Sequence, residues 1–332
     1  MTAGRTDAGA VAKKGRRMRS AARGLFGTVF PTVGTVFCML FFLLRPEVGR
    51  ASVLDGLRLA GLGVLPAVFP FLVLSDLLIS GGGLPRALTS FAGTLFRLPG
   101  AGGTAILLGW LCGFPIGARC AADAFRTGRL SREEAERAAR IASIPSPAFL
   151  IGGVGAGMLR DRGAGLFLFL AALLSATLTG LLESYPKRKE RSPGREDRFP
   201  PAQRFPLRLT GAVRGSATAS LQLCAYVVFF SALNGAVGAI LGQFGAGDVP
   251  RAVISGLLEL SGGVSAACAT GMPIPALLLC SAMTGWCGLS VLFQIASVCD
   301  GCGFRFGRLI LSKALQSAIC LILTGMWIRF AF

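Results

Sequence analysis

The sequence predicts an all-α polytopic membrane protein, built as a two-repeat helical bundle with re-entrant or broken helices. Composition is the first reason: hydrophobic residues make up 53% of the 332 residues and charged residues only 15%, and the mean hydropathy is +0.65. Soluble domains carry about a quarter charged residues. The second reason is a series of apolar segments of roughly 20 residues, the length at which a helix crosses about 30 Å of hydrocarbon.

The third reason is a motif that the two halves share. Residues 109–114 read Gly-Trp-Leu-Cys-Gly-Phe, and residues 285–289 read Gly-Trp-Cys-Gly-Leu. Gly113 and Gly288 lie 175 positions apart, and a second pair of glycines has the same offset. Interrupted apolar segments at matching places in two halves indicate a substrate site at a repeat interface. The pattern therefore favours transport.

Nine segments are long and apolar enough to span a membrane. The first, residues 25–44, carries no charge. It is longer than the core of a signal peptide and no small-residue cleavage site follows it, so we expect it to remain as the first span. The other candidate spans lie near residues 59–80, 98–118, 141–159, 163–182, 217–243, 249–271, 272–298 and 308–330.

Basic residues cluster in three patches between the spans, which predicts the topology. Cytoplasmic loops carry an excess of Lys and Arg, so we place the patches, and with them the N-terminus, on the cytoplasmic side, near anionic lipid head groups. The predicted organisation is a basic cytoplasmic tail (1–24), a first transmembrane half (25–182) with a cytoplasmic arm (119–140), a basic Pro-rich linker (183–210) and a second transmembrane half (211–332).

Two segments break this regular pattern. Residues 98–118 begin and end on the cytoplasmic side under this topology, so we expect them to be re-entrant, and residues 272–298 are their broken counterpart in the second half. The orientation of the second half stays open. In the arm, Ser131 and Glu134 have the spacing of a capping box. We expect a solvated helix there, with a regulatory or partner-binding arm as the alternative.

Several functions are excluded or disfavoured by composition. The net charge of +18 comes without a basic surface interleaved with aromatic residues, so we expect no nucleic-acid partner. The chain has no histidine, which excludes a Ser-His-Asp triad. Cys299 and Cys302 form the single C-x-x-C, too few ligands for zinc, and no P-loop motif occurs. We expect no catalytic residue, no metal and no cofactor.

The motif around Pro115 is the strongest candidate for a substrate site. Pro115 interrupts a helix, and irregular backbone at membrane depth must be buried by protein or line a watery cavity. We expect Gly113, Phe114, Pro115 and Gly117 to shape the site and Arg119 to meet a carboxylate. Exposed half-helix N-termini would also attract an anion. The alternative is simple close packing, since glycines four residues apart are typical of helix contacts.

A second irregular stretch follows at residues 143–147, which contain two prolines. Ser143 and Ser146 could offer hydroxyls to a substrate there. A proline-initiated helix start explains the stretch equally well.

Ionisable and polar groups inside the spans complete the candidate site. A carboxylate in hydrocarbon costs about 2.5–3.5 kcal/mol and usually serves an ion, a proton or a substrate. We expect Asp76 and Glu259 to couple to an ion or proton, and Glu259 to contact the substrate as well. Asn234, Ser290 and Gln294 are further substrate candidates, with interhelical hydrogen bonding as the alternative for each.

A family resemblance lies in five segments, which are residues 69–76, 109–119, 146–152, 256–260 and 288–294. They resemble the YlbJ-type sporulation integral membrane proteins, over roughly residues 50–330. The resemblance implies membership of the nucleoside-recognition or gate-domain superfamily, and an architecture similar to concentrative nucleoside transporters. It also implies a role in spore formation, with dipicolinate passing across the outer forespore membrane of a bacterial cell. The chain departs from the family at Ser143, where the family has asparagine.

Together these observations predict a transporter or facilitator of a small anionic aromatic solute, with dipicolinate as the first candidate. A nucleoside-type solute is one alternative. A non-transporting membrane scaffold or assembly factor in sporulation is another, since GxxxG surfaces would suffice for it. We expect no enzymatic activity, and a homo-oligomer stays open.

Overall fold

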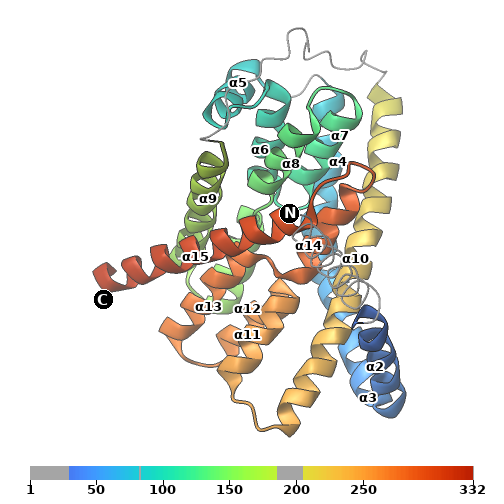
Figure 1. Cartoon of the computed structure of the whole chain (residues 1–332), viewed down its shortest axis with the longest axis vertical. Coiled ribbons are helices and arrows are strands. Elements are labelled where there is room, and N and C mark those ends of the chain that lie inside the picture. Colours follow the sequence, from blue (N-terminus) through green and yellow to red (C-terminus); the bar gives the residue numbers. More distant parts are fainter. Residues whose placement is uncertain (1–29, 82–83, 185–204, 332) are drawn as a thin grey trace, which may run out of the picture. The chain divides into compact units, whose positions relative to one another are not determined.

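The computed structural model describes residues 30–81, 84–184 and 205–331, and among these every regular element is a helix, with no strand (Figure 1). The predicted tail 1–24 lies outside the described residues, as does most of the linker 183–210. The chain divides into two compact units, Met1–Ala51 and Ser52–Phe332.

The described part of the first unit contains α2 (Phe30–Leu44) and the start of α3 (Pro46–Arg58). Helix α2 belongs to the predicted first span, and it leaves apolar side chains such as Leu40 and Leu43 more than half exposed, as contact with lipid requires. Pro46 begins α3, where its missing N–H costs nothing because the first helical N–H groups have no intrahelical partner.

The helices of the second unit follow one another in two series. After α3, the first series is η2 (Leu59–Val64), α4 (Leu65–Ser80), α5 (Arg86–Leu95), α6 (Gly100–Cys112), α7 (Ile116–Arg126), α8 (Arg132–Ala142), η3 (Ala148–Leu159) and α9 (Arg162–Ser184), of which η2 and η3 are π-helices. The second series is α10 (Phe205–Gln243), α11 (Asp248–Leu258), α12 (Leu260–Ala269), α13 (Pro273–Trp286), α14 (Gly288–Val298) and α15 (Phe306–Ala331).

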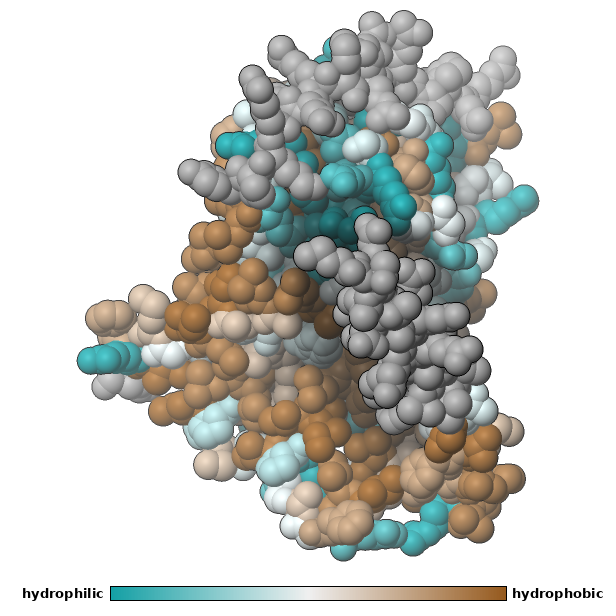
Figure 2. Space-filling view, in the orientation of Figure 1, coloured by the Kyte–Doolittle hydropathy of each residue, from teal (hydrophilic) through white to brown (hydrophobic). Residues whose placement is uncertain are grey.

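The lengths and composition of these helices fit a membrane. Four are long and apolar enough to cross one, namely α9, α10, the consecutive pair α13–α14, and α15, and two bent helix pairs raise the number to as many as six. One bent pair is α5–α6, whose segments meet at 94°. Hydrophobic surface covers α9, α13 and α15, whereas hydrophilic surface gathers near α7 and α8 (Figure 2). The all-α polytopic membrane fold is confirmed.

The internal repeat extends well beyond the shared motif. An offset of 175 residues places α5, α6, α7 and α8 on α12, α13, α14 and α15, and each helix begins within three residues of its counterpart. Packing repeats too: a Cβ on Gly109 would lie 2.2 Å from the Ala142 carbonyl oxygen, and one on Gly285 would lie 2.5 Å from the Ser317 backbone. The helices of the two segments therefore match in order and in position along the chain, but α6 and α7 pack against each other, whereas α13 and α14 follow one another as a single 26-residue span.

Helix α8 differs from the solvated arm that its charges suggested. The capping box is confirmed, since the Ser131 hydroxyl accepts from the Glu134 N–H at 3.3 Å and Glu134 Oε2 accepts from the Ser131 N–H at 2.7 Å. The rest of α8, residues 135–142, is buried. Arg140 binds Glu136 at 3.0 Å and Glu183 at 2.5 Å, so these three charges compensate one another. Arg137, which is also buried, donates to the Arg97 carbonyl at 3.3 Å.

Candidate substrate site at the helix breaks

In the first repeat, the break between α6 and α7 lies against the break between α8 and η3. Gly113 has φ +83°, a conformation that glycine adopts without steric cost, and its Cβ position is 2.7 Å from the Ser146 nitrogen. The Phe114 N–H donates to the Ile144 carbonyl at 3.0 Å. Pro115 is the N-cap residue of α7. Two interrupted helices therefore satisfy part of each other's free backbone.

Close packing surrounds this crossing. Gly109 and Gly117 both contact Ala142, so the glycines four residues apart do serve helix contact, while Phe114 packs against both hydrophobic clusters of the second unit. Ser143 donates its hydroxyl to the Ala139 carbonyl at 2.6 Å. No solute is needed to explain these contacts, and the substrate roles predicted for Gly113, Phe114, Pro115 and Gly117 stay predictions.

In the second repeat, the break between α13 and α14 lies against the break between α11 and α12. Cys287 and Gly288 have φ of +71° and +81°. A Cβ on Gly288 would lie 2.9 Å from the Leu260 nitrogen. The indole of Trp286 donates to the Leu257 carbonyl at 3.1 Å, as the indole of Trp110 does to the Ile141 carbonyl, also at 3.1 Å, in the first repeat. A tryptophan thus secures each broken segment.

Glu259 occupies the second crossing and caps α12. Its carboxylate accepts from the Ser261 N–H at 3.0 Å and from the Gly262 N–H at 2.5 Å, while the side chain is nearly fully buried. These N–H groups lack intrahelical partners, and the helix dipole favours a negative group there.

A cavity of about 330 Å³ with both apolar and polar lining residues lies beside Glu259, and residues of α10 form its other wall. Asn234 lines it and donates to the Ser255 hydroxyl at 2.6 Å. Arg251 also lines it, and its Nε is buried without a hydrogen-bond partner among the described residues. The structure thereby brings together two predicted site residues, Glu259 and Asn234, in a space of the size that holds small ligands.

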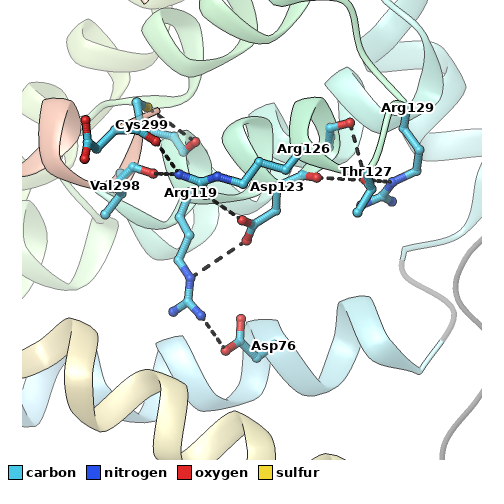
Figure 3. A network of polar contacts seen from close by, with 11 residues as sticks. Asp76, Arg119, Asp123, Arg126, Thr127, Arg129, Val298 and Cys299 are labelled. Carbon is cyan, nitrogen blue, oxygen red and sulfur yellow. Dashed lines mark hydrogen bonds and ion pairs between the residues drawn. The ribbon is translucent and has the colours of Figure 1, made fainter. Parts of the chain in front are cut away.

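Asp76 and Arg119, for which we predicted separate roles, form an ion pair. Arg119 Nη2 lies 3.1 Å from Asp76 Oδ2, and its Nε lies 3.9 Å from Asp123 Oδ2 (Figure 3). Asp123 in turn binds Arg126 at 2.9 Å, and Arg126 donates to the Val298 carbonyl at 3.0 Å (Figure 3). This network connects α4 to α7, and α7 to the end of α14. Arg119 therefore has a protein carboxylate as its partner.

The remaining predicted residues have local partners. Ser146 accepts from the Phe149 N–H at 3.2 Å and so provides a partner for an N–H in the first turn of η3. Gln294 donates to the Ser290 hydroxyl at 3.2 Å, both on α14, and both are buried. The structure does not place this pair among the residues that line the Glu259 cavity.

Sequence reasoning missed Lys313. This residue of α15 is fully buried, and its ammonium donates to the Ser143 carbonyl and, at 2.7 Å, to Gln316 Oε1. A signal was present, because Lys313 is the one charge between Leu309 and Met326 in the last apolar span. The rule that flags intramembrane carboxylates applies equally to an intramembrane cation.

These features define a multi-pass α-helical membrane protein in which two repeats carry broken helices and a cavity adjoins one break. The chain is similar to the sporulation integral membrane protein YlbJ of Bacillus subtilis (strain 168). The two are 27% identical over an alignment 330 positions long, which covers 86% of this chain and 80% of that relative. No family model matches the sequence, and no solved structure matches it significantly.

Proposed function

We propose that this chain is a transporter or facilitator for a small polar solute, that it belongs with the YlbJ-type proteins, and that it acts in spore formation. The observation that carries the transport proposal is the cavity beside Glu259. Broken helices persist at membrane depth where protein covers them or where they line a cavity, and here the α11–α12 break adjoins a cavity that Glu259, Asn234 and Arg251 help to line. The similarity to a sporulation membrane protein supports the biological setting.

For the solute, we propose a small anionic aromatic acid, with dipicolinate crossing the outer forespore membrane as the first candidate. The volume of about 330 Å³ suits a single-ring ligand. Arg251 would meet a carboxylate through its unpartnered Nε, and Asn234 and Ser255 would donate further hydrogen bonds. Arg119 would contribute only in a conformation that releases it from Asp76.

A nucleoside-type solute is the second candidate, because the same cavity also presents groups that suit sugar hydroxyls. Asp55 and Glu259 supply carboxylates, and Ser231 supplies a hydroxyl that both donates and accepts. An uncharged, hydroxyl-rich solute would use these acceptors, whereas an aromatic acid would depend on Arg251.

Uptake into proteoliposomes tests both candidates. Vesicles containing the full chain are given labelled dipicolinate or labelled uridine, and we expect dipicolinate to accumulate. Asn234→Ala should reduce its uptake about tenfold, because hydrogen bonds made in the cavity are lost. Gln222→Ala is the matched control, since Gln222 is an exposed residue of the same helix that does not line the cavity.

Two other results would redirect the proposal. Accumulation of uridine alone, lost in the Asn234 variant, would favour the nucleoside-type solute. If vesicles with correctly folded protein accumulate neither solute, the transport proposal fails and a scaffold or assembly factor takes its place.

A further inference from the structure

Lys313 reaches from the second repeat into the helix break of the first. It lies on α15, and its ammonium donates to the carbonyl of Ser143, the residue that ends α8. The negative end of a helix dipole attracts a cation. Position and chemistry therefore place a fixed positive charge where two repeats and one unwound segment meet.

The Lys313 ammonium lacks a counter-ion in the part of the chain that the structure describes. Among residues 30–81, 84–184 and 205–331, no carboxylate lies within 4.0 Å of the Lys313 ammonium. The carboxylate of Glu183 is already bound by Arg140, at 2.5 Å. A buried charge without a partner is costly, and such groups inside membranes usually serve an ion or a substrate.

The same place holds unused hydrogen-bond donors. An ammonium has three donors, and Ser143 and Gln316 account for two. Gln316 is 1% exposed, and its Nε2 has no hydrogen-bond partner among the described residues. Because Gln316 Oε1 accepts from Lys313, the amide nitrogen is left as a donor with nothing to bind.

We propose that Lys313 and Gln316 form the anion-binding subsite of the transport pathway and bind the carboxylate of a transported organic acid. The carboxylate would supply the missing negative charge and accept from both side chains, replacing the Ser143 carbonyl on the ammonium. The structure then represents the state in which the protein's own carbonyl occupies the subsite. This inference rests on the proposed transport function and names the group that selects for anionic solutes.

A comparison of two nearly isosteric probes tests the subsite. Dipicolinate carries two carboxylates, and the diamide of the same acid carries none. Binding of each to the purified full chain is measured, together with uptake into vesicles. Lys313→Gln should weaken dipicolinate binding about 10- to 100-fold, the range expected for lost charge-assisted hydrogen bonds, and leave diamide binding unchanged. Lys313→Arg should retain the preference for the anion.

Matched variants separate binding from folding. Ser312→Ala changes the buried neighbour of Lys313 on α15 and should leave both probes unaffected. Gln316→Leu removes the free amide but keeps the charge, and it should weaken dipicolinate binding about tenfold. This variant carries the test if Lys313→Gln does not fold.

Each remaining outcome decides the question. Equal loss of both probes in Lys313→Gln would make Lys313 a positioning residue for the 143–147 segment and overturn the subsite. Selective uptake that neither variant alters would overturn it as well, while the proposed function would stand. Wild-type vesicles that take up no probe would overturn the proposed function itself.

Discussion

Arg140 on α8 and Lys313 on α15, two helices that correspond in the sequence repeat, are buried charges with opposite kinds of partner. On α8, Arg140 is bound by Glu136 at 3.0 Å and by Glu183 at 2.5 Å. On α15, Lys313 has a carbonyl and an amide oxygen as partners and no carboxylate among the described residues. Arg140 is thus a charge that carboxylates compensate, whereas Lys313, like the buried Arg137 of α8 with its Arg97 carbonyl partner, has no carboxylate beside it among the described residues.

The difference indicates which charge is available to a ligand. Arg140 has two carboxylates, so a solute anion would have to compete with both. Lys313 has only neutral acceptors, and a carboxylate binds an ammonium more strongly than a carbonyl does. Arg140 therefore stabilises the fold, whereas Lys313 is suited to the recognition of an anion.

The largest effect is expected when the ion pairs of Arg140 are lost. Arg140→Met leaves Glu136 and Glu183 without their partner, and we expect a loss of about 3–5 kcal/mol in the free energy of unfolding. Lys313→Gln removes an uncompensated charge and should change it by less than about 1 kcal/mol. Unfolding in detergent measures both, with exposed Arg308→Met as the control. Equal effects at the two positions would contradict the comparison.

The next effect tests whether the repeats share their packing. Gly109→Ala places a Cβ 2.2 Å from the Ala142 carbonyl, and Gly285→Ala places one 2.5 Å from the Ser317 backbone. Each should destabilise the protein by about 1–3 kcal/mol, because a packed interior resists added volume. Gly325→Ala on α15 has open space around it and serves as the control. A neutral result at only one of the two glycines would show that their packing is not equivalent.

A smaller effect compares the caps at the two breaks. Glu259→Ala removes a carboxylate that accepts two N–H groups of α12, and it should cost about 1–2 kcal/mol. Ser146→Ala removes one hydroxyl acceptor from η3 and should cost about 0.5–1 kcal/mol. Glu259→Gln keeps an acceptor and should lie between wild type and Glu259→Ala. A larger cost at Ser146 than at Glu259 would reverse the expected order.

The smallest effect concerns the ion pair of Arg119 and Asp76. Both side chains are about one quarter exposed, so solvent screens them. Asp76→Asn should change the free energy of unfolding by no more than about 1 kcal/mol, and less at high salt. Unfolding at two ionic strengths measures this, and a loss that does not depend on salt would indicate that the pair is more deeply buried.

The sequence carried enough information for the fold because the relevant signals are local. Apolar length indicates spans, proline and glycine mark breaks, and the spacing of Ser131 and Glu134 predicts the cap that the structure contains. The offset between Gly113 and Gly288 predicts the repeat, because equivalent breaks need equivalent backbone freedom.

Partners far apart in the chain could not be predicted in this way. The pairing of Arg140 with Glu183 spans 43 positions, and that of Arg119 with Asp76 spans the same distance. The local periodicity of a sequence carries no information about such contacts. For this reason α8 was expected to be solvated although its residues 135–142 are buried. Likewise, Asp76 and Arg119 have separate predicted roles but form an ion pair.

Helix α10 has a consequence for how a motion would travel. Its 39 residues extend over about 58 Å at 1.5 Å per residue, nearly twice the hydrocarbon thickness of about 30 Å. Asn234 lies on the wall of the Glu259 cavity, and Arg208, near the other end, binds the Ser80 carbonyl at 3.0 Å. A continuous helix is stiff, so a tilt of α10 at the cavity wall would also displace its far end and the contact of Arg208 with Ser80.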